Sequence, residues 1–354
     1  MVFKWSVDLG PLVSILIPSY NAEPWIAETL TSALAQTWVN IEIIVVDDGS
    51  TDHTLAAARK FASTRVQVIS QPNGGASAAR NRALKAAQGN YIQYLDADDL
   101  LEPDKIERQL ELLVNGNPDW IASGAWARFF DHPSRSQFVP QMLWTDAAPV
   151  DWLVTAWTHH LMMHPAAWLV PRHISERAGP WDETLSLDDD GEYFSRVILA
   201  SSMIKFCAAV KTYYRSGMAA SLSGRRSPEA LLSGYRSIEL GCAHLLSQED
   251  SARTRRTCAA RYQRFIYEVY PAVPELMALA QAKVAALGGA RAPVNGGPVF
   301  RLAASVVGWK LARRLQLFGY ARGYKSIMGR RSDEGRLKAF YGVREARPSE
   351  GDEA

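Results

Sequence analysis

Short apolar runs alternate with amphipathic stretches over residues 12–99. Val-, Ile- and Leu-rich runs occupy residues 13–17, 41–46, 66–69 and 91–95. After the first run, apolar residues recur at helical spacing, at Ile26, Leu30, Ala33 and Leu34. Short β-branched runs are typical of strands, and a period near 3.6 residues is typical of helices. The alternation predicts βαβ units around a parallel sheet.

Turn residues mark where some of these elements begin and end. Pro24 suits the first turn of the first helix, and Gly74-Gly75 interrupts the chain before an alanine-rich helix at 76–88. Gly89 is well placed to stop that helix. The turn residues in 12–99 therefore fall at the element boundaries that the hydrophobic pattern predicts.

Three carboxylates lie directly after the fourth apolar run, in Asp96-Ala97-Asp98-Asp99. Like charges this close are unfavourable unless a cation or strong donors compensate, and carboxylates are ligands of hard divalent cations. The cluster therefore indicates a metal site that could bridge the protein to a diphosphate. Acidic residues are also favourable near the N-terminus of a helix, so a helix that starts near Pro103 would explain the pattern equally well.

A second acidic pair, Asp47-Asp48, closes the second apolar run. Its carboxylates could accept hydrogen bonds from a nucleotide base or a ribose hydroxyl, and an ordinary turn with a capping aspartate is the alternative. Both acidic clusters follow predicted strands. Open parallel sheets bind ligands beyond the carboxyl ends of their strands, so both clusters lie where a ligand is expected.

The rest of the chain has a different pattern. Residues 100–217 are rich in tryptophan and predict mixed helix, irregular loops and a few antiparallel strands, such as 168–170. Beyond Ser227 the sequence predicts helices, interrupted by Pro271, Pro274 and a loop at 288–298.

Composition narrows the class of protein. The 39 basic and 37 acidic side chains leave a formal charge of +2, so no global field favours nucleic acid. Three widely spaced cysteines fit neither a disulfide scaffold nor a thiolate zinc site. No stretch approaches the roughly 18 uninterrupted apolar residues expected of a spanning helix. We expect a cytoplasmic enzyme that binds no nucleic acid.

Four motifs in order carry a resemblance to a known family. They are Val13 to Asn21 (VSILIPSYN), Ile44 to Asp52 (IVVDDGSTD), Ala79 to Arg82 (ARNR) and Leu95 to Asp99 (LDADD). Together they closely resemble family 2 glycosyltransferases. This implies a GT-A-like α/β domain at 11–217, with a Rossmann-type, mostly parallel sheet flanked by helices, a nucleotide-sugar-binding half at 11–104 and an acceptor half at 105–217. A C-terminal helical region at 218–354 extends it.

The resemblance also implies roles on the donor side. Pro18, Tyr20, Glu23 and Asp48 would border the nucleotide base, with Asp48 accepting from a uracil N3–H. Arg80 would lie near the base and phosphates. Asp98 would hold Mn²⁺ or Mg²⁺, and Asp96 would face the ribose or the metal's water shell.

On the acceptor side, the resemblance makes Asp190 the catalytic base. Asp189 takes the first position of the acidic pair, where the family usually has glutamate, and we expect it to contact the acceptor. Trp181, beside the acidic cluster, is a further candidate for acceptor binding. His164 is expected to line the acceptor pocket or to pack in the core. Apart from the resemblance, a solvated helix start is the better explanation of Asp188 to Asp190.

A basic, apolar pattern recurs near the C-terminus. Residues 296–331 contain eight Lys or Arg residues and no acid. Apolar residues at helical spacing accompany them, at Phe300, Ala303, Val307, Leu311, Leu315 and Phe318. Such a helix could lie on an anionic membrane surface near a lipid-linked acceptor, or pack on the core with its basic edge in water.

The sequence therefore predicts an inverting, metal-assisted glycosyltransferase that uses a nucleotide sugar, most readily a UDP-sugar, and a sugar or lipid-linked acceptor in surface polysaccharide or glycoconjugate assembly. One alternative is a non-catalytic nucleotide-sugar-binding protein of the same fold. The other is a sugar nucleotidyltransferase, although the first strand is followed by Pro18-Ser-Tyr-Asn21, which is not a glycine- and lysine-rich phosphate loop.

Overall fold

The computed structural model describes residues 10–217, 227–292 and 298–321. Internal contacts divide the chain into two units. The first comprises Met1–Val269 with Val273–Arg291, and the second comprises Tyr270–Ala272 with Ala292–Ala354. The first unit contains both sheets and the candidate site.

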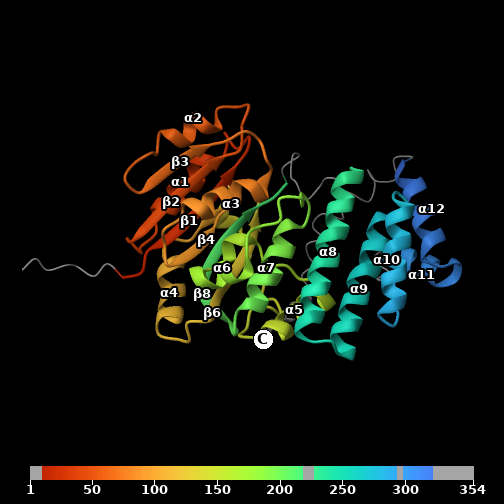
Figure 1. The fold of residues 1–354 in the computed structure, drawn as a ribbon. Coiled ribbons are helices and arrows are strands. Elements are labelled where there is room, and N and C mark those ends of the chain that lie inside the picture. The colour runs from red at the N-terminus through yellow and green to blue at the C-terminus, as the bar shows by residue number, and fades with distance from the viewer. Residues whose placement is uncertain (1–9, 218–226, 293–297, 322–354) are drawn as a thin grey trace, which may run out of the picture. The chain divides into compact units, whose positions relative to one another are not determined.

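The main sheet has five strands in the order β3-β2-β1-β4-β7 (Figure 1). Strands β1 (Val13–Ser19), β2 (Ile41–Asp47), β3 (Val66–Ser70) and β4 (Tyr91–Tyr94) pair in parallel, and β7 (Val170–Pro171) pairs antiparallel to β4. The predicted GT-A-like, mostly parallel sheet is confirmed. Because the order reverses at β1, a crevice is expected at the carboxyl ends of β1 and β4.

Three short helices connect these strands: α1 (Ile26–Leu34), α2 (Thr54–Arg59) and α3 (Ala76–Ala86). The third ends before the predicted limit at residue 88, because Ala87 is already extended. Gly89 has a packing role, since a Cβ there would lie 2.5 Å from the Ser14 backbone nitrogen in β1. The sequence pattern identified the glycine but misassigned its function as a helix stop.

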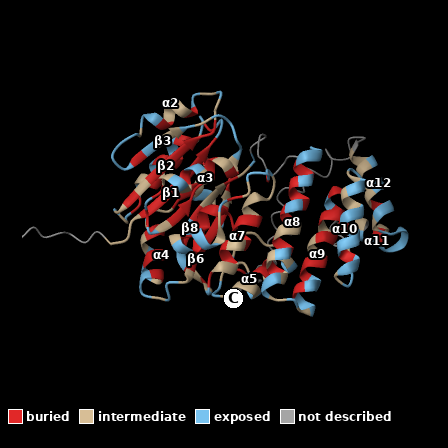
Figure 2. Cartoon of the chain, in the orientation of Figure 1, coloured by how far each residue is buried: buried red, intermediate tan, exposed pale blue. Residues whose placement is uncertain are grey.

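The core of this half is the sheet's apolar side chains and the helix faces that cover them. Ile15, Ile17, Ile43 and Val45 are fully buried, as are Ile26 and Leu30 on α1. Figure 2 shows the central strands as an almost continuous buried layer beneath partly exposed helices. Near-continuous apolar strands are the pattern of a sheet covered on both faces.

The segment at 100–217 is more regular than predicted. A second sheet has the order β5-β8-β6, with β5 (Leu100–Leu101), β6 (Trp120–Phe129) and β8 (Met203–Arg215). The predicted antiparallel strands are present in β7, near 168–170, and in β5. The longest pair of this segment, β6 and β8, is instead parallel, which the sequence did not predict. Their partners are about eighty residues apart in the chain, so local pattern gave no signal of the pairing.

Helices surround this second sheet. They are α4 (Lys105–Val114), α5 (Pro149–His159), α6 (Arg172–Ala178) and α7 (Asp189–Ala200), with short 3₁₀ turns at Pro133–Arg135 and Pro165–Ala167. The first residues of α7 are the acidic cluster found in the sequence. The fold therefore places that cluster at a helix start.

The predicted C-terminal helices are also present. In the first unit they are α8 (Pro228–Gln248), α9 (Ala252–Val269) and α10 (Pro274–Ala286). Helix α8 begins with Ser227 as a capping residue, whose hydroxyl accepts from the Ala230 backbone N–H. Figure 1 shows α8 beside α7 and α9 beyond α8. Helix α9 still reaches the acidic cluster, because its Arg261 donates to Asp188.

The second unit is described through α11 (Pro298–Val307) and α12 (Trp309–Ala321), which pack on each other through Ala304 and Ala312. Gly308 separates them, so the predicted apolar stripe runs over two helices. Residues 322–331 of that stripe lie outside the described residues. No helix of the described segments is both long and apolar enough to cross a bilayer.

Candidate active site

The carboxyl ends of three parallel strands bring most of the predicted donor residues together. Strand β1 runs into Tyr20, β2 into Asp48 and β4 into Asp96. Pro18 is buried in β1, where it is paired with Val46 across the strand ladder. Tyr20 is 48% exposed, so its ring is available to a ligand above this edge.

Asp48 is buried and its carboxylate is heavily engaged. Oδ1 accepts from Gln71 Nε2 at 2.8 Å and from the Gly74 backbone N–H at 2.9 Å, and Oδ2 accepts from the Gly75 N–H at 2.8 Å. Asp48 thus fixes the loop that begins α3. A carboxylate has about four lone-pair positions, so these three bonds leave room for one more donor.

Glu23 also has a local partner. Its Oε2 accepts from the His53 backbone N–H at 3.1 Å, and its own N–H donates to Asp52 Oδ2 at 3.2 Å. These bonds connect the loop after β1 with the start of α2. Glu23 therefore shapes the rim of the predicted base pocket, and its side chain is exposed there.

Arg80 connects the two halves of the site. From α3, its Nη2 donates to Asp96 Oδ1 at 2.9 Å and its Nη1 donates to Asp189 Oδ2 at 2.7 Å. Burial alone lowers the pKa of Arg80, but the carboxylates of Asp96 and Asp189 raise it above its ordinary value. The guanidinium is therefore charged, and it holds the end of β4 beside the start of α7.

Trp181 forms the floor beneath that guanidinium. The Arg80 Cζ lies 4.4 Å from the centre of its ring, and the ring stacks on Tyr193 at 4.0 Å. Only 2% of Trp181 is exposed. The contacts make Trp181 a packing residue of the site, so the predicted stacking on an acceptor sugar finds no support here.

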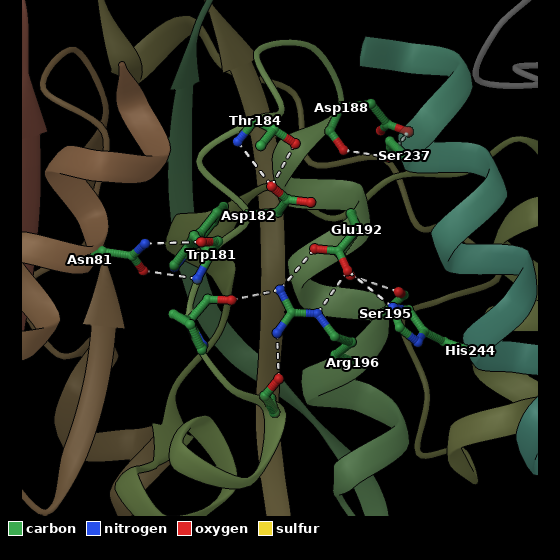
Figure 3. A network of polar contacts seen from close by, with 12 residues as sticks. Asn81, Trp181, Asp182, Thr184, Asp188, Glu192, Ser195, Arg196, Ser237 and His244 are labelled. Carbon is green, nitrogen blue, oxygen red and sulfur yellow. Dashed lines mark hydrogen bonds and ion pairs between the residues drawn. The ribbon is translucent and has the colours of Figure 1, made fainter. Parts of the chain in front are cut away.

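Figure 3 shows how the segment carrying Trp181 is held. Asn81 of α3 bonds both polar groups of the Trp181 backbone, at 2.9 and 2.8 Å. Arg196 of α7 donates to the Ala178 and Pro180 carbonyls and pairs with Glu192 one turn earlier. His244 of α8 also contacts Glu192, at 3.1 Å. The segment is thereby fixed against α3, α7 and α8.

The three consecutive aspartates at the start of α7 have three different partners. Asp188 has a positive φ of 60° and faces the C-terminal helices, where its Oδ2 accepts from Ser237 and Arg261, each at 2.9 Å. Asp189 binds Arg80. The cluster is thus a junction of separate contacts rather than a solvated helix start.

Asp190, the third of these residues, bonds only its neighbour among the described residues, accepting from the Gly191 backbone N–H at 2.9 Å. Its removal from bulk water, reinforced by the carboxylates of Asp189 and Asp188, raises the pKa of Asp190 to about 7. Gly191 is required next to it, because a Cβ there would lie 2.3 Å from Asp188 Oδ1. A carboxylate with this pKa can accept a proton near neutral pH.

The acidic cluster after β4 is electrostatically crowded. Burial, together with the charges of Asp99 and Asp96, raises the pKa of Asp98 to about 8. Arg215 of β8 offsets part of this charge by donating to the Asp98 carbonyl at 2.8 Å, and its Nη2 pairs with Glu28. The guanidinium thus holds the backbone of the cluster.

Residue Asp99 is fully buried and pairs with His164. The His164 Nδ1 lies 3.4 Å from Asp99 Oδ2, and its Nε2 lies 3.0 Å from Thr212 Oγ1. Burial lowers the pKa of His164 to about 3, so its imidazole is neutral, and burial raises the pKa of Asp99 well above its ordinary value. His164 is 1% exposed, which favours the packing alternative over acceptor contact.

Asp96 and Asp98 fit a divalent cation in part. Among the described residues, no group of three or more His, Cys, Asp or Glu side chains is arranged to hold a metal ion. Carboxylates are nonetheless the right donors, and the raised pKa of Asp98 reflects negative charge that a cation would offset. Mg²⁺ typically takes one or two carboxylates and completes its shell with phosphates and water.

Comparison with known proteins agrees with this geometry. Residues 14–168 match the model of glycosyl transferase family 2, a region that spans β1 to the 3₁₀ turn before β7 and contains Asp48, Arg80, Asp96 and Asp98. Over these residues the chain is similar to family 2 glycosyltransferases.

Curated relatives share the domain. The chain is 35% identical over 182 residues to the uncharacterized glycosyltransferase EpsJ of Bacillus subtilis, which covers 51% of this chain and 52% of EpsJ. It is 41% identical over 107 residues to the UDP-Glc:alpha-D-GlcNAc-diphosphoundecaprenol beta-1,3-glucosyltransferase WfgD of Escherichia coli, covering 30% and 42% of the two chains. The chain therefore spans about half the length of these relatives.

A solved glycosyltransferase structure extends the likeness beyond the matched domain. The 1–349 fragment of S. aureus TarS in complex with UDP-GlcNAc superposes with a TM-score of 0.65. The match covers 88% of this chain and 92% of that one, at 18% sequence identity. At this identity the likeness confirms the fold.

Several residues of the candidate site escaped sequence reasoning. Ser237, Arg261 and His244 lie on α8 and α9, yet they bind Asp188 and Glu192 at the start of α7. They are about fifty to seventy residues from their partners, and their helices read as an independent extension. The sequence gave a weak signal for Arg196, because Glu192 precedes it by one helical turn and opposite charges at that spacing pair on a helix.

We predict that Arg80→Met destabilises the protein strongly. The substitution leaves the Asp96 and Asp189 carboxylates without their shared cation, and losing one partner of a buried ion pair costs about 3–5 kcal/mol. Arg82→Met, at an exposed position of the same helix, should stay within about 0.5 kcal/mol. Chemical denaturation measures both, and equal losses would contradict the bridging role.

Proposed function

We propose that this chain is an inverting glycosyltransferase that moves a sugar from a UDP-sugar to an acceptor hydroxyl. One observation carries the proposal: a single buried arginine, Arg80, joins Asp96 of the predicted metal motif to Asp189, the neighbour of Asp190. The group that would bind the donor diphosphate and the group that would deprotonate the acceptor therefore belong to one site.

The donor would bind at the carboxyl ends of β1, β2 and β4. In this proposal the base lies beside the exposed Tyr20 ring and Pro18, and the remaining lone-pair position of Asp48 accepts a base N–H. The TarS complexes with UDP and with UDP-GlcNAc, and the UDP-Glc in the name of WfgD, support a uridine diphosphate sugar.

Asp190 would act as the general base. The acceptor hydroxyl donates its proton to the Asp190 carboxylate while its oxygen attacks the anomeric carbon, and the nucleoside diphosphate leaves from the opposite face. Direct displacement of this kind inverts the anomeric configuration. Arg80 helps by holding Asp189 away from the reacting atoms, so that only one of the two neighbouring carboxylates is free to take the proton.

Asp98, assisted by Asp96, would hold a divalent cation such as Mn²⁺ or Mg²⁺. When bound, such an ion stabilises the charge that develops on the leaving diphosphate. The setting we propose is assembly of a surface polysaccharide or glycoconjugate, which the name of WfgD supports.

Substituting the base should separate catalysis from folding. We expect Asp190→Asn to lower transfer by about 10²–10⁴-fold while UDP binding is retained. Wild-type kcat/KM should fall below about pH 7, where the Asp190 carboxylate becomes protonated, and reach a plateau above it. Asp182→Asn, on the same segment, should keep the rate and the profile, and a flat profile in the wild type would contradict this role.

The raised pKa of Asp190 also predicts how the protein's stability depends on pH. Because folding raises the pKa of Asp190 from 3.8 to about 7, its charged form opposes folding at high pH and its neutral form does not. Asp190→Asn should therefore raise the Tm at about pH 8 and leave it nearly unchanged at about pH 4. Thermal unfolding at the two pH values measures the difference, and an equal shift at both would contradict the pKa assignment.

Metal-assisted donor binding is testable by thermal shift. UDP with Mn²⁺ should raise the Tm, and EDTA or Asp98→Ala should remove most of the rise, because selective ligand binding stabilises the folded state. Asp104→Ala, at the half-buried start of α4 and outside the Asp96–Asp99 cluster, provides the control. A UDP shift that is indifferent to both EDTA and Asp98→Ala would argue against metal ligation by this residue.

We further propose peripheral contact with an anionic membrane through α11 and α12. Leu302, Val306, Leu311 and Leu315 are 48–76% exposed there, with Arg301, Lys310 and Arg314 on the same two helices. Co-sedimentation with phosphatidylglycerol vesicles at low salt should be lost in Leu315→Glu and kept in Leu279→Glu, an equally exposed leucine of α10. Absence of wild-type co-sedimentation would remove the membrane contact.

A further inference from the structure

A cavity of about 400 Å³ adjoins the proposed base. Its walls come from α5, α7, α8 and α9, and Asp190 and Gly191 form part of its lining. The volume is within the roughly 300–1,000 Å³ of ordinary ligand pockets. Because the region that matches the family ends at residue 168, the walls from α7, α8 and α9 lie outside it.

The body of this cavity is aromatic and aliphatic. Its lining includes Trp152, Met163, Phe194, Leu231, Ile238 and Phe265. A sugar ring buried among such side chains would leave hydroxyl groups without hydrogen-bond partners, which is costly. A hydrocarbon group has no such cost and gains free energy with each methylene removed from water.

The charged side chains in the walls already have partners. Asp188 is paired with Arg261, and Arg264 is paired with Glu268. Burial and the charge of Arg264 lower the pKa of His160 to about 4, so its imidazole is neutral. These groups therefore do not require a charged ligand.

Asp190 differs from the other acidic residues of the wall. Among the described residues its only hydrogen bond comes from the adjoining backbone N–H of Gly191. The cavity thus combines an apolar body with one carboxylate that is open to a hydroxyl. This is the arrangement expected for a ligand with a hydroxyl-bearing head and an apolar tail.

We propose that the cavity binds a hydrocarbon chain of the acceptor and so places the acceptor's hydroxyl at Asp190. The inference rests on the proposed function, because it assumes that Asp190 is the base. The acceptor would then be a glycolipid-like molecule with an alkyl or isoprenoid chain. Helices α8 and α9 would take a direct part in selecting it.

The first experiment measures binding of n-alkyl β-D-glucosides of increasing chain length, each below its micellar concentration, by the intact protein. Affinity should rise with chain length, by at most about fourfold per added methylene, the equivalent of about 0.8 kcal/mol. Leu231→Trp fills the cavity from α8 and should abolish this dependence. Leu232→Trp, the exposed neighbour on the same helix, should retain it.

A second cavity-filling variant helps to distinguish loss of the cavity from misfolding. Ala156→Phe enlarges a buried side chain of the wall contributed by α5. UDP binding and thermal unfolding are measured on every variant. A variant that keeps its UDP affinity and loses only the chain-length dependence supports the cavity, and chain-length dependence that survives in both filled variants overturns it.

The last measurement distinguishes the hydrocarbon chain of an acceptor from that of an unrelated lipid. Release of UDP from a panel of UDP-sugars should be stimulated by the alkyl glucosides, and more strongly as the chain lengthens. Binding without any effect of chain length on UDP release would overturn the assignment to the acceptor. Failure of every variant and the wild type to bind UDP would instead count against the proposed function.

Discussion

The site depends on one buried cation shared by two carboxylates. Arg80 lies on α3, next to β4, and reaches both Asp96 and Asp189 at hydrogen-bonding distance. Without it, the end of a strand and the start of a helix would present like charges to each other across a buried space. Trp181 packs beneath the guanidinium, and Asn81 and Arg196 hold the backbone of that tryptophan segment. The end of β4 and the start of α7 are therefore joined through a single ion-pair network.

Crowded negative charge is the second constraint. The pKa values of Asp98 and Asp190 are raised to about 8 and about 7, because both groups are withdrawn from water beside other carboxylates. The two residues are suited to different chemistry in consequence. Asp98 is positioned to gain from a bound cation, whereas Asp190 is positioned to gain from a proton. A third crowded acid, Asp99, has its pKa raised by burial and by the charge of Asp96. It lies beside His164 and accepts from the Arg215 backbone N–H.

The helices after the second sheet belong to the site as much as to the scaffold. Ser237 and Arg261 fix Asp188 in its left-handed conformation, and this sets the direction in which α7 begins. The same helices enclose the apolar cavity at Asp190. The family-matched region ends before them, so they are the part of this chain where acceptor preference can differ from that of relatives that share the donor half.

The sequence by itself determined the parallel sheet, the positions of its strands and the two acidic clusters that follow them. These are local properties, since hydrophobic period and turn residues act over neighbouring positions. It also indicated Arg80, Asp98 and Asp190 through motif resemblance. Only the tertiary structure decided that Asp188, Asp189 and Asp190 face three different partners, that β6 and β8 pair in parallel, and that Trp181 and His164 are packed. Each of these depends on contacts between segments far apart in the chain, whose burial and charge no local pattern contains.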